Sequence, residues 1–290
     1  MFDILRKSLA TGVVTTSFPG EPVPVGELAG RGRPLIDFAN WKDARPACAA
    51  CPTGALSCAD KGTEREVSLD LGKCTFCGLC AEADPAIRMS NDSQLATACR
   101  QALVTTAGYE LTPAGSHARR IEPWPCKTAA NIRSQRSNEG SLDDVGRELE
   151  RRVKKMLGRS LHIREVDAGS CNGCEVEIVG LNSPIYDIER FGIHFVASPR
   201  HADMLLVTGP VSRNMELALK KTYDAMPSPR LVVAVGACGC SGGIFGQNYA
   251  SLGGVDKVVP VDVYIPGCPP NPYALLQGIL VAVGRWEGNR

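Results

Sequence analysis

The sequence predicts an α/β protein of two units, an α+β unit followed by a doubly wound parallel sheet. Two observations lead to this prediction. Closely spaced cysteines dominate the early part of the chain, between residues 48 and 84. Beyond residue 158, short apolar runs alternate with helical stretches, and strands that alternate with helices imply a parallel sheet. At 290 residues the chain is long enough for two domains with their own cores.

Composition narrows the range of functions. The formal net charge of +1 argues against nucleic acid as a partner. No run approaches the roughly 20 apolar residues that span a bilayer, so we expect no transmembrane segment. The first residues carry neither a long apolar region nor a twin-arginine signal, which argues against export. The 13 cysteines of such a chain favour metal sites over disulfides.

The first predicted domain covers residues 1–110. It opens with a short amphipathic helix within residues 1–18, which could lie on a membrane-arm partner, on lipid or on its own domain. Residues 19–34 are rich in Pro and Gly and predict an extended loop. Residues 66–71 predict a strand just ahead of the main cysteine run.

The cysteine spacing is that of a bacterial-type two-cluster ferredoxin. In that pattern C-x2-C-x2-C-x3-C-P occurs twice, and the fourth Cys of each run ligates the other cluster. The second run here reads Cys74-x2-Cys77-x2-Cys80-x3-Asp84-Pro85. The first run is recognised by its end at Cys51-Pro52, and counting back places Trp41, Ala44 and Ala47 at its other three ligand positions.

The crossed ligation sorts these eight positions into one lost site and one intact site. The first cluster would need residues 41, 44, 47 and 84, and none of them is a cysteine. The other needs Cys51, Cys74, Cys77 and Cys80, and all four are present. We therefore predict a ferredoxin-like domain with a single [4Fe-4S] cluster. Cys48 is the alternative fourth ligand, because Cys48-x2-Cys51 is also a plausible ligand pair by spacing.

Residues 111–157 are predicted to form a linker and a basic helix. Up to residue 140 the sequence has prolines and polar residues without periodicity, which is typical of a linker. Ser141 and Asp144 resemble a capping box at the start of a helix. The last turns of that helix are basic, and the helix dipole stabilises positive charge at a helix C-terminus. We expect a solvated basic face, with anionic lipid or an acidic partner as the alternative.

The second predicted domain covers residues 158–290 and is a flavodoxin-like parallel sheet. We expect strands at 161–166, 193–197, 204–208, 231–235 and 261–265, and helices at 174–191, 212–226 and 271–286. Such sheets bind ligands beyond the carboxyl ends of their strands. Cys171, Cys238 and Cys268 each follow a predicted strand, and Cys174 lies one helical turn beyond Cys171. These four thiols are therefore predicted to converge on one metal centre.

Zinc is the rival metal for any site of four cysteines. Structural zinc sites favour two paired Cys motifs, whereas the second set here is one pair and two single cysteines in Gly-rich turns. Glycines let backbone N–H groups approach cluster sulfurs. We therefore favour two [4Fe-4S] clusters. The remaining cysteines are expected to be free thiols: Cys58, Cys99, Cys126 and Cys240.

The motifs of the second domain resemble the small subunit of membrane-bound energy-converting [NiFe]-hydrogenases of the formate hydrogenlyase type. The resemblance rests on Cys171-Asn-Gly-Cys174-Glu175, Ser198-Pro-Arg-His-Ala-Asp203, Gly236-Ala-Cys238 and Pro266-Gly-Cys268-Pro-Pro270. That family is related to the complex I subunit that carries the terminal cluster, in which the first two ligands are adjacent cysteines. The C-x2-C spacing here is that of the hydrogenases. Residues 1 to about 107 are similar to the ferredoxin-like subunit of the same complexes, through Arg31-Gly-Arg-Pro34 and the run from Cys74 to Cys80.

The resemblance implies that Cys171, Cys174, Cys238 and Cys268 hold a proximal cluster beside a NiFe centre. That centre would lie in a partner large subunit, because this chain lacks the two C-x2-C pairs that it needs. The chain would be an oxidoreductase subunit that transfers electrons and has no catalytic residue of its own. Further implied partners are membrane-arm subunits and an electron donor or acceptor protein, such as a ferredoxin or a formate dehydrogenase module. The implied location is peripheral, on the cytoplasmic side of the inner membrane.

Two other functions stay open at this point. The first is an electron-transfer module of a complex I-like quinone or ferredoxin oxidoreductase without hydrogenase activity. The second is a scaffold whose clusters only stabilise folding.

Among other polar residues, Glu175 and Glu177 open the helix after Cys174, where the helix dipole stabilises acids. A proton-relay or interface role for Glu175 is the less favoured alternative. The four histidines show no pairing at ligand spacing, and no Lys-Ser/Thr follows Gly242-Gly243, so we expect a turn there.

Overall fold

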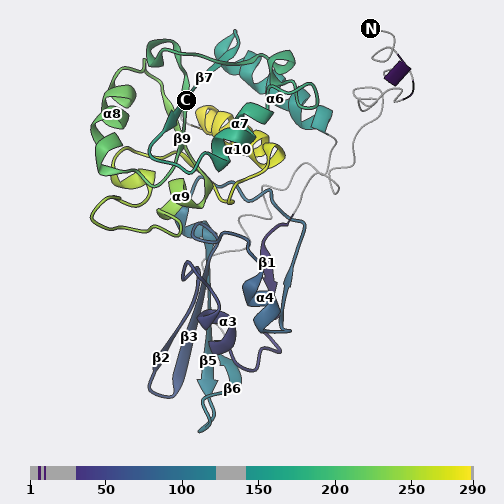
Figure 1. The fold of residues 1–290 in the computed structure, drawn as a ribbon, viewed down its shortest axis with the longest axis vertical. Coiled ribbons are helices and arrows are strands. Elements are labelled where there is room, and N and C mark those ends of the chain that lie inside the picture. The colour runs from purple at the N-terminus through teal and green to yellow at the C-terminus, as the bar shows by residue number, and fades with distance from the viewer. Residues whose placement is uncertain (1–5, 8–9, 11–30, 122–141, 289–290) are drawn as a thin grey trace.

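The computed structural model describes residues 6–7, 10, 31–121 and 142–288, and these residues form two units joined end to end (Figure 1). Most of the predicted N-terminal helix, Cys126 and Ser141 lie outside the described residues. A parallel sheet in one unit and antiparallel sheets in the other confirm the predicted α/β class. Among the described helices, none is long and apolar enough to cross a membrane.

The C-terminal unit contains a five-stranded parallel sheet in the order β11-β10-β9-β7-β8. Counted along the chain this is 2-1-3-4-5, one of the two common orders of doubly wound sheets. The strands are β7 (Leu161–Asp167), β8 (Ile193–Phe195), β9 (Met204–Thr208), β10 (Leu231–Val235) and β11 (Val263–Ile265). Every residue of β9 and β10 is buried, as expected for central parallel strands.

Helices cover both faces of this sheet. Successive residues of a strand point to opposite faces, and the two cores of this unit divide accordingly. Met204 and Leu206 pack with α6 (Leu142–Leu157), α7 (Gly173–Gly180) and α10 (Pro272–Gly288). Leu205 and Val207 pack with Leu219 of α8 (Arg213–Asp224). A short helix, α9 (Gly236–Ser241), follows β10 directly.

The N-terminal unit is built on a four-stranded antiparallel sheet in the order β2-β3-β5-β6. The strands are β2 (Leu56–Lys61), β3 (Glu64–Asp70), β5 (Val104–Leu111) and β6 (His117–Ile121). A separate antiparallel pair joins β1 (Pro34–Ile36) and β4 (Ile87–Met89), and two short helices, α3 (Arg45–Ala49) and α4 (Leu79–Ala83), pack together. β6 lies in a stretch that we expected to be a linker without regular structure.

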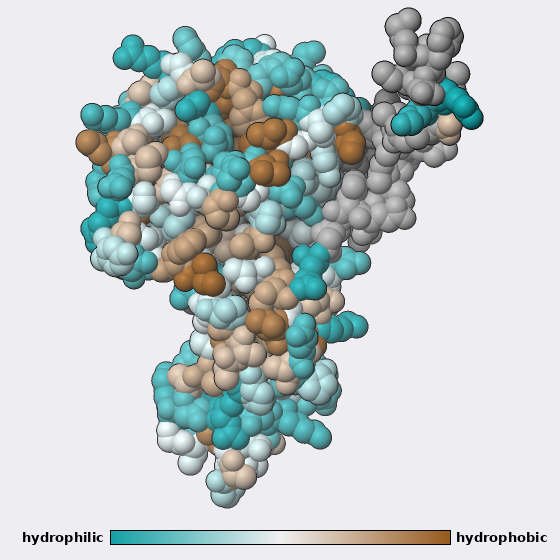
Figure 2. Space-filling view, in the orientation of Figure 1, coloured by the Kyte–Doolittle hydropathy of each residue, from teal (hydrophilic) through white to brown (hydrophobic). Residues whose placement is uncertain are grey.

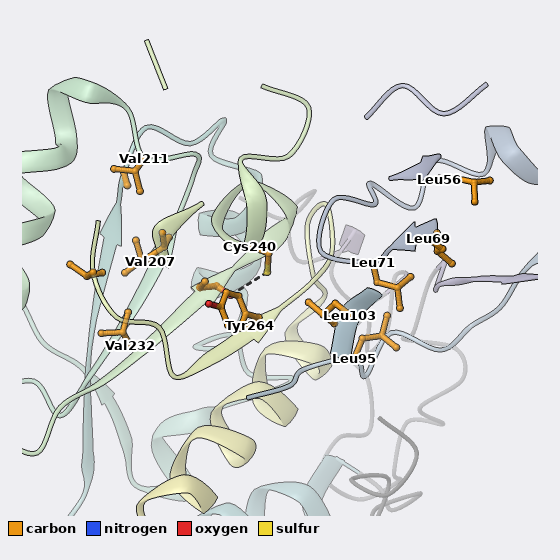
Figure 3. Packing of buried hydrophobic residues seen from close by; sticks show 14 of the residues in the cluster. Leu56, Leu69, Leu71, Leu95, Leu103, Val207, Val211, Val232, Cys240 and Tyr264 are labelled. Carbon is orange, nitrogen blue, oxygen red and sulfur yellow. Dashed lines mark hydrogen bonds between the residues drawn. The ribbon is translucent and has the colours of Figure 1, made fainter. Parts of the chain in front are cut away.

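The two units share one apolar core. Residues 95–103 of the N-terminal unit lie against the edge strand β11, and Thr97 and Tyr264 exchange both backbone hydrogen bonds, at 3.0 and 2.8 Å. Figure 3 shows Leu71, Leu95 and Leu103 beside Tyr264 and Cys240, with β9 and β10 beyond them. The junction is therefore packed as a protein interior rather than joined by a loose tether.

Three of the four positions of the lost ligand set are filled by buried apolar side chains. Trp41, Ala44 and Ala47 are all at most 3% exposed. The fourth position is the buried Asp84, whose carboxylate accepts hydrogen bonds from the Trp41 indole N–H at 2.7 Å and from the Ala86 N–H at 2.9 Å. A direct hydrogen bond therefore joins residues 41 and 84, which are 43 residues apart. The crossed pattern assigns both positions to the same lost cluster.

β6 completes the surroundings of Trp41. His117 stacks on Tyr109 of β5, with ring centroids 3.9 Å apart, and its Nδ1 lies 2.9 Å from the Trp41 carbonyl oxygen. Both rings meet the Trp41 ring edge-on. The sequence around residue 117 does not predict a strand, because the contacts that hold β6 are made with Trp41, which is distant in the sequence.

We expect Trp41→Phe to lower the free energy of unfolding of the N-terminal unit by about 1–3 kcal/mol, because the buried Asp84 loses a donor. Urea unfolding measures the effect. Tyr109→Phe is the matched control, because it removes one hydrogen bond from the same cluster, to the neutral Phe38 carbonyl at 2.8 Å. A Trp41→Phe protein as stable as wild type would contradict the structural role of the Trp41–Asp84 contact.

Candidate metal centres

The four cysteines predicted for the first site line a single small pocket. Cys51 follows α3, Cys74 and Cys77 lie in the loop after β3, and Cys80 is on α4. The other lining side chains are mostly apolar and include Leu56, Leu69, Phe76 and Met89. The structure thus brings a run of three cysteines together with one from the preceding segment.

Backbone N–H groups point at the sulfurs of this site. The Leu56 N–H donates to the Cys51 Sγ and the Phe76 N–H donates to the Cys74 Sγ, each at 3.4 Å. Phe76 and Gly78 have positive φ angles of 53° and 89°, so the loop curls tightly around the thiols. Burial raises the pKa of Cys74 to about 12, the Phe76 N–H lowers it, and the nearby Cys80, Cys51 and Cys77 raise it further. Without metal this thiol keeps its proton, and iron binding would displace it.

Cys48, the alternative fourth ligand, does not line this pocket. It is half-buried on α3, where burial and the neighbouring Cys58 raise the pKa of its thiol. The geometry therefore favours Cys51 over Cys48 at the first site.

The second set of four cysteines lies beyond the carboxyl ends of the parallel strands. Cys171 follows β7, Cys174 is in the first turn of α7, Cys238 is on α9 and Cys268 follows β11. Burial raises the pKa of Cys238 to about 11, and the charges of Cys268 and Cys171 raise it further. The thiols are therefore close enough to interact electrostatically, although they come from three separate parts of the chain.

Glycines leave room for sulfur at this second site. A Cβ added at Gly236, where φ is +80°, would lie 2.7 Å from the Cys174 Sγ. A Cβ added at Gly243, where φ is +57°, would lie 2.8 Å from the Cys238 Sγ. Because these glycines have no side chain, backbone N–H groups there can approach the cysteine sulfurs, as the N–H···S hydrogen bonds of iron–sulfur sites require. The positive φ angles of Gly242 and Gly243 also show the turn expected there.

Both donor sets fit a [4Fe-4S] cluster, which takes four thiolates. Among the described residues, no three His, Cys, Asp or Glu side chains lie close enough together to hold a single metal ion. A cluster places its own iron and sulfide atoms between the thiolates, so it does not require them to converge on one point.

The two sites influence each other electrostatically across the junction of the units. Burial raises the pKa of Cys268, and the charges of Cys171 in its own set and of Cys77 in the other set raise it further. Cys77 and Cys268 are also both exposed. In Figure 1, α9 lies at the junction, whereas α3, with Ala47 of the lost ligand set, lies farther from it.

A pocket of about 330 Å³ lies between α7 and the end of the sheet formed by β7 and β8, and its lining includes Arg164 and the acidic residues Glu165 and Glu175. Both carboxylate oxygens of Glu175 are buried without a hydrogen-bond partner in the part of the chain that the structure describes. Burial raises the pKa of Glu165, and the charge of Glu175 raises it further. The sequence did not indicate a buried position for Glu165, because a charged residue in an alternating strand ordinarily faces solvent.

The histidines do not contribute to either site. His162 and His194 are register partners on the parallel strands β7 and β8, with ring centroids 6.2 Å apart. This pairing arises from strand order, so no spacing along the sequence could have indicated it. His201 is in an exposed turn, and His117 packs in the aromatic cluster around Trp41.

Comparison with known proteins places this second site in a family. Residues 171–282, which contain all four of its cysteines, match the family described as the NADH ubiquinone oxidoreductase 20 kDa subunit. Formate hydrogenlyase subunit 7 of Escherichia coli is 48% identical over 147 residues, which are 51% of this chain and 58% of that protein. A probable membrane-bound hydrogenase subunit of Pyrococcus furiosus is 46% identical over 138 residues, which are 47% of this chain and 83% of that protein.

A third relative comes from the respiratory branch of the family. An NADH-quinone oxidoreductase subunit of Desulfovibrio desulfuricans is 52% identical over 107 residues, which are 37% of this chain and 58% of that protein. The chain thus spans somewhat more than half of the length of the Escherichia coli and Desulfovibrio desulfuricans relatives and most of the Pyrococcus furiosus relative. It belongs to the family of the NADH ubiquinone oxidoreductase 20 kDa subunit, and the predicted resemblance of the second domain is confirmed.

We expect Gly243→Ala to abolish cluster binding at the second site, because the new methyl group would collide with the Cys238 sulfur. Gly246→Ala is a matched control, since Gly246 has the same φ of +57° and open space around its Cβ position. Iron and acid-labile sulfide analysis after anaerobic reconstitution gives the readout. The prediction fails if both variants lose iron equally, since the effect would then come from backbone strain alone.

Proposed function

We propose that this chain is the iron–sulfur electron-transfer subunit of a membrane-associated [NiFe]-hydrogenase-type complex, formed by a ferredoxin-like unit fused to a flavodoxin-like unit. One [4Fe-4S] cluster binds to Cys51, Cys74, Cys77 and Cys80. The other binds to Cys171, Cys174, Cys238 and Cys268. The observation that carries the proposal is the pocket lined by all four thiols of the first set, in a chain that also keeps the second set in Gly-rich turns and whose relatives include hydrogenase subunits.

The chemistry that the bound clusters supply is one-electron transfer. The protein ligates the iron through thiolates, and N–H groups such as those of Leu56 and Phe76 stabilise the negative charge on sulfur. Apolar walls around the first site limit the access of water. Because electron tunnelling decays steeply with distance, we propose that electrons pass between the sites near Cys77 and Cys268, two exposed thiols that belong to different units and interact electrostatically.

The surface near the second site supports docking of a large subunit that holds the NiFe centre. Val176 and Val179 of α7 are 61% and 69% exposed, and Ile244 and Phe245 after α9 are 58% and 53% exposed. Figure 2 shows apolar residues gathered over this face, whereas the free end of the N-terminal unit is mostly hydrophilic. The exposed Cys171 and Cys268 belong to the same region of the fold.

The other proposed partners are membrane-arm subunits and an electron donor or acceptor such as a ferredoxin or a formate dehydrogenase module. The proposed location is peripheral, on the cytoplasmic side of the inner membrane. No nucleic acid takes part.

The second candidate function is a complex I-like quinone or ferredoxin oxidoreductase module without hydrogenase activity. The similarity to the NADH-quinone oxidoreductase subunit of Desulfovibrio desulfuricans favours it. The C-x2-C spacing of Cys171 and Cys174 favours the hydrogenase instead. Purification of the native complex through a tag on this chain separates the two, because a hydrogenase complex oxidises dihydrogen with an artificial acceptor dye and the alternative does not.

We expect the reconstituted wild-type chain to bind about eight irons and eight sulfides, and Cys51→Ala to bind about four fewer irons. Electron paramagnetic resonance of the reduced protein should show two interacting signals in wild type and one in Cys51→Ala. Cys48→Ala is the matched control and should keep both.

Three outcomes would contradict parts of the proposal. Tightly bound zinc without sulfide would identify zinc sites, and clusters that cannot be reduced and reoxidised would favour a scaffold. Loss of a signal in Cys48→Ala but not in Cys51→Ala would make Cys48 the ligand.

A further inference from the structure

One largely buried guanidinium group bridges the two units. Arg100 has a side chain that is only 17% exposed. Its Nη1 and Nη2 atoms donate to the two carboxylate oxygens of Asp70, each at 2.8 Å, and its Nε donates to the Cys240 carbonyl oxygen at 3.0 Å. Asp70 belongs to the N-terminal unit and Cys240 to the C-terminal unit. The guanidinium group of Arg100 therefore makes hydrogen bonds to both units.

Both ends of this bridge lie next to cluster ligands. Asp70 ends β3 and opens the loop that leads to Cys74, whereas Cys240 lies on α9 with Cys238. A second contact runs parallel to the first, because the Ser241 hydroxyl donates to the Gly72 carbonyl oxygen at 2.9 Å. The bridge thus links the backbone that carries one ligand of the first site to the backbone that carries one ligand of the second.

The guanidinium lies directly on the Gly72 backbone. A Cβ added at Gly72 would be 2.6 Å from the Arg100 Cζ, so only glycine leaves room for this contact. The Gly72 N–H also donates to the Asp70 Oδ1 at 2.9 Å. Asp70 therefore fixes the loop and Arg100 together, and the arrangement depends on the planar fork of arginine, which lysine cannot reproduce.

Other polar contacts between described residues of the two units are made elsewhere. Thr97 pairs with Tyr264 of β11, the Ala96 N–H donates to the side chain of Gln277 on α10, and the Asn271 side-chain amide donates to the Ser93 hydroxyl at 3.2 Å. These contacts attach residues 93–97 to β11 and α10, but they do not touch the loop before Cys74 or α9. Arg100 and Ser241 make the polar contacts that join these two ligand-bearing segments.

We propose that Arg100 is a positioning residue that fixes the separation of the two clusters, and this inference rests on the proposed electron-transfer function. A single separation gives a single rate of electron transfer between the sites. Without the bridge, the Ser241–Gly72 hydrogen bond alone would join the loop before Cys74 to α9, and the separation of the sites would spread into a distribution. The packed core would still hold the units together, so the loss would concern geometry rather than folding.

The test uses the full-length chain, reconstituted anaerobically, with Arg100→Lys as the main variant. Lysine keeps the positive charge, so any effect of charge on the reduction potentials is retained while the bidentate bridge is lost. Asp70→Asn is a second variant that weakens the same bridge and keeps an oxygen for the Gly72 N–H. The readouts are iron content, the magnetic interaction between the two reduced clusters, and hydrogen exchange of the metal-free chain.

Arg159→Lys is the matched control. Arg159 forms a bidentate pair with Asp203 at 2.8 and 2.6 Å, but both residues lie within the C-terminal unit. This variant loses an ion pair of the same geometry without touching the junction.

We expect Arg100→Lys and Asp70→Asn to bind as much iron as wild type, and the splitting that arises from the interaction of the two clusters to be lost or broadened. Amides of residues 70–74 and 238–243 should exchange faster in the metal-free variants, and neither change should appear in Arg159→Lys. Wild-type splitting and wild-type exchange in Arg100→Lys would overturn the inference, as would equal effects in Arg159→Lys. A wild-type chain without two reducible clusters would overturn the proposed function itself. The wild-type chain is therefore measured first, which separates failure of the proposed function from failure of the inference about Arg100.

Discussion

The arrangement of this molecule depends on the backbone pairing between Thr97 and Tyr264. Edge strands leave a row of N–H and C=O groups unpaired, and β11 is the edge of the parallel sheet. The N-terminal unit satisfies part of that edge with residue 97 and buries Leu95 and Leu103 behind it. Because β11 leads straight to Cys268, the same pairing that seals the edge joins the N-terminal unit to the strand that precedes a ligand of the second site.

The second site follows from a general property of parallel sheets. Their strands end on the same side, so short connections after β7, β10 and β11 bring distant cysteines together. The first site has a different origin, because its thiols come from a tight loop and two short helices beside an antiparallel sheet. Two unrelated ways of gathering four thiols are thus combined in one chain, and a shared core joins the two units that carry them.

The features that the sequence predicted well are those governed by local pattern. The apolar runs at 204–208 and 231–235 are strands with the expected bounds, and the cysteine spacing indicated which thiols would lie together. The helix expected at 174–191 ends at Gly180 instead, because Pro184 cannot continue it. β6, the Glu165 pocket and the Arg100 bridge were not predictable, because each depends on contacts between residues far apart in the chain. The Gly-rich helix α9 was missed because its composition favours turns.

The hydrogen bond between Trp41 and Asp84 has a consequence for the history of the chain. A cluster requires all four thiols, so a single cysteine at position 41, 44, 47 or 84 brings no cluster. Each such change would, however, disturb a buried site, and changes at residues 41 and 84 would break the contact between them. A change at residue 41 or 84 therefore loses a buried hydrogen bond without gaining a cluster. The loss of that cluster is therefore hard to reverse, and the N-terminal unit keeps a single cluster site.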